Sequence, residues 1–336
     1  MSLAWESRFG LARGAVFVHG RPHIYLEGLE VDPALDRLGA VSVARLRTKA
    51  GGIGFLGLAD GAEAVLDAPQ PVLAGLDEGA ALEIEIVAEA RTWLSGGKLA
   101  RARLIAQATG DPRPLSAPQS LHERLVAAAA ALGAGDDGHD DPDALDEAEA
   151  EAFAPSGPMA GGGYLSLEPT RALIACDIDA GGHDGVATAR AFAKSCNERA
   201  MSELARRLRL SGLGGLVVVD LIGRRHDGAR LTGLLRHAAG PEADRLVIGP
   251  LGKFGTLECV WPWTRRPLAD SAASPLRAAH LLLREAVRRA EPGRLLTLRG
   301  PQTVLDKVRP LLAGSHDPLA AVIRLETGTK PEVILS

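Results

Sequence analysis

The chain has 336 residues, of which 46% are apolar, and its 38 Lys and Arg against 42 Asp and Glu give a formal net charge of −4. This length suggests about two domains and this composition a globular core, which excludes disordered and fibrous proteins. The sequence has no apolar run near the ~18–20 residues of a membrane span, no export signal and only three scattered cysteines, so we expect a cytoplasmic protein without membrane association or a cysteine-rich metal site.

Short strands dominate the first part of the chain. Residues 1–35 are predicted to contribute two strands, Gly14–Val18 and His23–Leu26, that pack on the later α/β domain. Residues 36–108 hold five apolar runs at roughly ten-residue spacing with glycine turns between them, which is typical of a small β-barrel. The five runs are Ala40–Leu46, Gly54–Leu58, Glu63–Leu66, Leu82–Ala88 and Ala100–Ile105.

Residues 109–160 are predicted to be an acidic connector with one helix, Leu121–Leu132. Within them, residues 136–151 hold nine acidic residues and no Lys or Arg, so the rest of the chain carries +5. Residues 187–236 hold ten basic residues against four acidic ones. This asymmetry of charge keeps nucleic acid among the candidate partners.

From residue 161 onward the pattern alternates between strand and helix. An apolar strand ends at Asp177, a helix follows with apolar residues spaced three or four apart, and the strand Gly215–Ile222 comes next. Strand, helix, strand in this order predicts a βαβ unit with two parallel strands. Residues 269–336 form a smaller α/β segment. The expected fold class is therefore α/β, or α+β overall, with a barrel in the N-terminal part.

Aspartates end both strands of the βαβ unit. Asp177 ends the first and Asp220 the second, so both side chains should lie at the carboxyl edge where open α/β sheets bind ligands. Two carboxylates this close repel each other unless a cation lies between them, and two carboxylates with several waters suit Mg²⁺. Asp179 is a third candidate. The alternative is that Asp177 or Asp179 only caps the following turn.

Three segments resemble the catalytic region of the ribonuclease E/G family, namely GGGYLSLEPTRALIACDIDAG at 161–181, NERAMSELARRLRLSGLGGLVVVDLI at 197–222 and KFGTLE at 253–258. The resemblance implies that Asp177 and Asp220 hold a catalytic magnesium ion, while Asp179 stands where the family has asparagine. It further implies a catalytic domain at 161–268. Upstream, two stretches within 36–108 resemble a diverged OB-fold RNA-binding domain.

The departures from the family are as specific as the matches. The insert that senses the RNA 5′ phosphate is missing, and the zinc-linking Cys-Pro-x-Cys is reduced to a lone Cys259. Gly223 stands where the family has an acidic residue. We therefore expect a short, diverged member without 5′-end sensing or a zinc-linked oligomer; a homodimer stays open.

Aromatic and basic residues are the expected RNA contacts. Phe55 and Lys98 match RNA-contacting positions of the family, with a barrel-core aromatic and a solvated hairpin lysine as the alternatives. Three arginines after the second aspartate could bind phosphate, since guanidinium is a bidentate phosphate partner, or form a solvated basic face. The predicted RNA contacts are Phe55, Lys98, Arg224, Arg225, Arg230 and Lys253.

These observations favour a magnesium-dependent endoribonuclease that cleaves single-stranded RNA with a metal-activated water. One alternative is an RNA-binding protein of the same family with weak or no turnover. A second is an Asp-x-Asp phosphatase, because LIACDID also describes the nucleophile strand of such enzymes. The phosphatase is less favoured, because the later strand ends in Asp rather than Ser or Thr.

Overall fold

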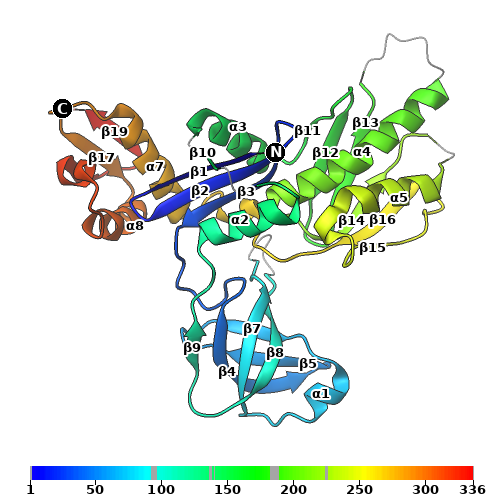
Figure 1. Cartoon of the computed structure of the whole chain (residues 1–336), viewed down its shortest axis with the longest axis horizontal. Helices are drawn as coiled ribbons and strands as arrows, with labels where there is room; N and C mark the ends of the chain where they lie inside the picture. Colours follow the sequence, from blue (N-terminus) through cyan, green and yellow to red (C-terminus); the bar gives the residue numbers. More distant parts are fainter. Residues whose placement is uncertain are drawn as a thin grey trace.

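The computed structural model describes residues 2–91, 97–135, 138–139, 141–181, 189–223 and 226–335. It shows a mixed α/β protein in which a closed five-stranded barrel lies below a longer body of sheets and helices (Figure 1). This architecture confirms the predicted fold class, including the barrel and the βαβ unit. No helix in the described part of the chain combines the length and the apolar composition that crossing a membrane requires.

A small antiparallel sheet at the N-terminus forms the centre of the body. Its elements and the helices on it are β1 (Ser2–Arg8), β2 (Leu11–Val18), β3 (Arg21–Leu29), the short parallel β10 (Gly138–His139), α2 (Leu121–Ala131) and α3 (Pro142–Phe153). Helix α2 packs on one face and α3 on the other. Strand β1 was not predicted, because Leu3 and Ala4 face opposite helices and its sequence lacks the alternation of a half-buried strand.

The barrel closes because β4 pairs with both β5 and β7. Its strands are β4 (Val41–Ala50), β5 (Ile53–Gly57), β6 (Glu63–Leu66), β7 (Ala81–Ala88) and β8 (Ala100–Ala108), with β9 (Arg113–Ser116) added beside β4 and the helix α1 (Gln70–Ala74) after β6. Alternate leucine, isoleucine and alanine side chains fill its interior. All five strands overlap the runs predicted from the sequence, although β4 and β8 extend three to four residues beyond them.

The sheet that carries the aspartates has six strands and is covered by helices on one face (Figure 1). In spatial order it comprises β11 (Gly157–Pro158), β12 (Tyr164–Pro169), β13 (Ile174–Asp179), β14 (Gly215–Asp220), β16 (Thr256–Trp261) and β15 (Val247–Ile248), and the helices on it are α4 (Ala189–Ser211) and α5 (Gly228–Ala239), followed by the 3₁₀ turn η1 (Gly240–Glu242). Strands β13 and β14 are parallel and α4 connects them, as predicted. Apolar side chains of α4 and α5 pack against alternate residues of the strands, which leaves the other alternate residues on the open face.

The last part of the chain packs back on the first. It contains α6 (Leu268–Ser271), α7 (Pro275–Arg289), β17 (Leu296–Gly300), α8 (Gln302–Ala313), the 3₁₀ turn η2 (Pro318–Val322), β18 (Ile323–Thr327) and β19 (Glu332–Leu335). Their apolar core includes Phe9 from the turn between β1 and β2 and Leu11 from β2. The two ends of the sequence thus share one core.

The acidic segment is not a free connector. Much of it forms α3, and Glu149 accepts hydrogen bonds from Arg13, Arg277 and Arg284 at 3.0, 2.6 and 2.5 Å. Glu151 pairs with Arg206 on α4. Carboxylates of α3 therefore neutralise buried arginines, and part of the positive charge counted in residues 187–236 is internal and unavailable to RNA.

Candidate functional site

Asp177 and Asp220 lie directly side by side. Strand β13 continues to Asp179, two residues beyond its predicted end, because Ile178 is buried against the helices. The side chain of Asp177 points to the open face, and the parallel register pairs it with Asp220, the last residue of β14. Both carboxylates are exposed. The structure thus brings together the two aspartates that the sequence singled out.

A pocket of about 350 Å³ opens at these aspartates, and Ser166 and Glu168 of β12 contribute to its wall. Apart from Cys176, which is buried in the core, its donors are hard oxygen atoms, which suits Mg²⁺ rather than a soft metal. Among the described residues no third His, Cys, Asp or Glu joins the pair as a cluster of metal ligands. The residues present fit an ion held by two carboxylates and completed by water, which is a common arrangement for Mg²⁺.

Asp179 lies on the same face of β13, but it does not line this pocket. Its Oδ1 accepts a hydrogen bond from the backbone N–H of Gly181 at 2.8 Å. Gly163 lies opposite with a φ of +89°, and a Cβ there would approach the carbonyl oxygen of Asp179 to 2.9 Å. This close approach explains why the Gly161–Gly163 turn must end in glycine.

Asn197 on α4 fixes the chain that follows Asp220, a role that sequence analysis missed. Its side chain is 2% exposed, and its amide both donates to the carbonyl of Ile222 and accepts from the N–H of Ile222, each at 3.0 Å. The amide nitrogen also lies 3.4 Å from Nδ1 of His226. Asn197 is within a quoted motif, but only the fold shows that it holds the loop after β14.

We expect Asn197→Ala to raise the Mg²⁺ concentration needed to half-saturate the two aspartates, because Asp220 loses its anchored neighbour. Two lost buried hydrogen bonds also cost ~1–3 kcal/mol of stability. Asn197→Asp keeps the bond accepted from Ile222 but places a buried carboxylate oxygen against the Ile222 carbonyl, so it should be at least as damaging as the alanine variant. Calorimetric titration with Mg²⁺, with the folded fraction monitored by circular dichroism, tests this order; an unchanged Mg²⁺ requirement would show a purely structural role.

The predicted RNA contacts that the structure describes lie on different parts of the fold. Phe55 lies on the outside of the barrel, half-buried, because its neighbours Gly54 and Leu56 face the core. Lys98 is exposed, and its backbone pairs with Arg91 at the junction between barrel and body. On the body, Arg230 forms an ion pair with Glu198 at 3.5 Å and Lys253 is exposed. Arg224 and Arg225 lie outside the described residues.

Phe254, beside Lys253, is a second residue that sequence analysis missed. Its side chain is 93% exposed in the loop that leads into β16. That loop lies against the aspartate end of β14, because the N–H of Leu221 bonds to the carbonyl of Gly255 at 3.4 Å and Asp220 pairs with Thr256. No sequence signal distinguishes an exposed phenylalanine from a buried one here, since a single aromatic residue carries no periodicity.

The barrel joins the other end of β14. Arg91 donates to the carbonyl of Gly214 at 2.9 Å and stacks over the ring of Trp263 at 4.3 Å. Strand β14 starts at Gly215 and ends at Asp220, so the full length of the strand separates the barrel junction from the carboxylates.

Comparison with known proteins agrees with the geometry. The sequence model of the ribonuclease E/G family matches residues 143–261, which include the aspartate strands and the helix between them. Ribonuclease E of Nostoc sp. is 34% identical over 110 residues, or 32% of this chain and 16% of that protein. Ribonuclease E of Escherichia coli is 36% identical over 100 residues, or 29% of this chain and 9% of that protein. A chloroplastic ribonuclease E/G-like protein of Arabidopsis thaliana is 27% identical over 128 residues, or 37% of this chain and 13% of that protein. The chain thus spans only a small part of these relatives, and its similarity to the ribonuclease E/G family lies in residues 143–261.

Proposed function

We propose that this protein is a cytoplasmic endoribonuclease that uses Mg²⁺ to cleave single-stranded RNA. The observation that carries the proposal is the register of β13 and β14, which pairs Asp177 with Asp220 in an open pocket within the family-matched segment. The open face of the sheet leaves room for a polynucleotide to reach the carboxylates.

Each residue of the proposed site has a distinct role. Asp177 and Asp220 hold the ion, which when bound activates water and stabilises the charge that develops on the phosphate. The exposed Lys253 contacts a phosphate group in this proposal, and Phe254 offers an aromatic face to a base of the bound strand. Phe55 offers a second stacking surface on the barrel, and Asp179 supports the site by ordering the chain after β13 through Gly181.

The alternative is an RNA-binding protein without turnover. Two observations favour it: Asp179 is engaged with Gly181, and the described residues give the metal only two carboxylates. The decisive test incubates the purified chain with an AU-rich, end-labelled single-stranded RNA in Mg²⁺ or in EDTA. Fragments that form only with Mg²⁺ support the enzyme. A shifted RNA band without fragments supports the binding protein.

We expect Phe254→Ala to weaken RNA binding by ~1–3 kcal/mol, the usual contribution of one base stacked on an aromatic ring. Because Phe254 is 93% exposed, its removal should leave the melting temperature unchanged. Val247→Ala, which also trims an exposed apolar side chain of this domain, is the matched control. Fluorescence anisotropy with labelled RNA in Ca²⁺ measures binding without cleavage; equal affinities for the two variants would contradict the role of Phe254.

A further inference from the structure

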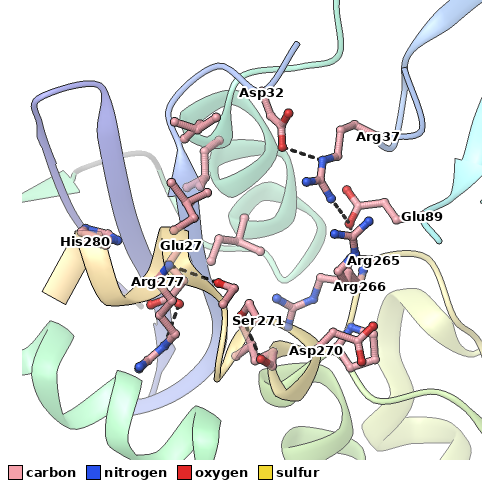
Figure 2. A pocket seen from close by; sticks show the side chains of 18 of the residues that line it. Glu27, Asp32, Arg37, Glu89, Arg265, Arg266, Asp270, Ser271, Arg277 and His280 are labelled. Atoms are coloured by element: carbon pink, nitrogen blue, oxygen red, sulfur yellow. Dashed lines mark hydrogen bonds and ion pairs between the residues drawn. The ribbon is translucent and has the colours of Figure 1, made fainter. Parts of the chain in front are cut away.

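A second pocket, of about 300 Å³, lies far from the aspartates in the fold, between β3, α2, α6, α7 and the end of β7. None of its lining residues lines the aspartate pocket. Figure 2 shows Arg37, Glu89, Arg265 and Arg266 gathered on one side and Glu27, Arg277 and His280 on the other. No residue of this pocket belongs to the proposed ribonuclease site.

Five arginines and four carboxylates line this pocket, and most of them form ion pairs. Glu89 is 3% exposed and forms an ion pair with Arg124 at 3.1 Å, while also accepting the backbone N–H of Arg266 at 2.9 Å. The guanidinium of Arg37 is 4.0 Å from the same carboxylate. One carboxylate thus serves several donors, while Asp32 and Asp36 pair with Arg37 and Arg266 respectively and Asp270 also lines the pocket.

Arg265 forms no ion pair among the described residues, although the charges of Glu89 and Glu242 favour its charged form. Its guanidinium donates to the backbone carbonyls of Tyr25 and Leu210 at 2.6 and 2.9 Å, and also to that of Arg209. Burial, and then the like charge of Arg124, lower the pKa of Arg265 to about 10. A buried cation beside a like charge is costly, and an anion bound next to it would offset that cost.

Five leucines form the apolar part of the pocket wall. Leu26, Leu29, Leu121, Leu268 and Leu276 all contribute to it. A bare inorganic anion would meet the arginines but leave these leucine side chains facing water. A ligand with a phosphate at one end and a flat, partly apolar group at the other would use both, as is typical of small-molecule sites with an apolar wall and a few polar groups.

We propose that this pocket binds a small organic phosphate of mononucleotide size, with its phosphate against Arg124 and Arg265. The site is coupled to the barrel, because Glu89 follows β7 and its backbone N–H donates to the carbonyl of Thr264 at 2.8 Å. A ligand that competes with Glu89 for Arg124 acts directly on the contact that holds the barrel to the body.

Calorimetric titration of the full chain tests the proposal with three probes: uridine 5′-monophosphate, inorganic phosphate and uridine. We expect the monophosphate to bind most tightly and inorganic phosphate more weakly, with no heat from uridine. Arg124→Gln should lower the affinity for the monophosphate at least tenfold, because a charge-assisted hydrogen bond is lost. The matched control is Arg309→Gln, which removes an exposed arginine of α8 and should change nothing.

Because Arg124→Gln leaves Glu89 with fewer partners and could impair folding, Ser271→Phe is the second variant. It fills the pocket from α6 without removing a charge, and it should abolish binding while the circular dichroism spectrum stays that of the wild type. Asp177→Asn should bind the monophosphate normally, which separates this site from the ribonuclease site. Equal binding of uridine and its monophosphate, no binding of the monophosphate at millimolar concentration, or normal binding by folded Ser271→Phe would each overturn the proposal.

Discussion

Replacement of either paired carboxylate, by Asp177→Asn or Asp220→Asn, is expected to reduce RNA cleavage by at least ~10²–10³-fold, the scale seen when one preorganised electrostatic group is removed from an active site. The amide is nearly isosteric with the carboxylate, so the pocket keeps its shape, but each variant offers Mg²⁺ only one negative charge instead of two. Gel analysis of end-labelled RNA at saturating Mg²⁺ measures the loss.

The same two substitutions should leave the stability of the fold unchanged or raise it. Like charges on adjacent strands repel each other, so each variant should melt at the same temperature as the wild type or higher when no metal is added. Mg²⁺ should raise the melting temperature of the wild type, because it binds only the folded state, and should do so less in the variants. Asp244→Asn, an exposed aspartate elsewhere on the domain, is the control. Variants that cut as well as the wild type would eliminate the metal site.

Glu203→Gln is expected to destabilise the fold by ~3–5 kcal/mol, the usual cost of breaking a buried ion pair by removing one partner. Glu203 on α4 is 4% exposed, and it lies 2.6 Å from nitrogen atoms of both Arg206 and Arg207 and 2.9 Å from Arg21 on β3. Without Glu203, Glu151 is the one remaining ion-pair partner that the described residues offer to the nearly buried guanidinium groups of Arg206 and Arg207. Urea unfolding at pH 7 measures the loss.

The ion pairs of Glu203 also predict that the stability of the fold depends on pH. Burial alone would raise the pKa of Glu203, but hydrogen bonds from Arg206 and Arg21 and the charges of Arg206 and Arg207 lower it to about 2. A carboxyl whose pKa is lower in the folded state stabilises fully above its unfolded value of about 4.5, and this contribution is lost as the pH falls toward 2. The difference between wild type and Glu203→Gln should therefore shrink between pH 5 and pH 2. Glu285→Gln, which breaks an exposed pair with Arg289, should cost less than ~1 kcal/mol at any pH.

The sequence was sufficient to place the aspartates. Apolar strands that end near Asp177 and Asp220, with a helix between them, dictate a common sheet edge, and the structure agrees down to the pairing of these two residues. The same kind of local reasoning located the barrel strands, because each carries its own alternation and turn signals. Structural features that depend on residues close together in the sequence could therefore be predicted.

Contacts between residues far apart in the sequence could not be predicted. The partners of Glu149 include Arg277, 128 positions away, and nothing in the spacing of charges indicates that a run of acidic residues folds against arginines so remote. The exposure of Phe254 and the anchoring of Ile222 by Asn197 depend on how loops pack, which composition does not encode. A net charge summed along the chain was the least informative quantity, because it counts buried pairs as surface charge.

The packing of α7 against the start of the chain constrains how the protein is made. Arg277 and Arg284 of α7 complete the charge balance of Glu149, which Arg13 of β2 also contacts. On the ribosome, β2 and α3 emerge long before α7, so at that stage Glu149 lacks two of its three cations. Burial of an underpaired carboxylate is unfavourable, and the N-terminal sheet therefore reaches its final packing only after α7 has been synthesised.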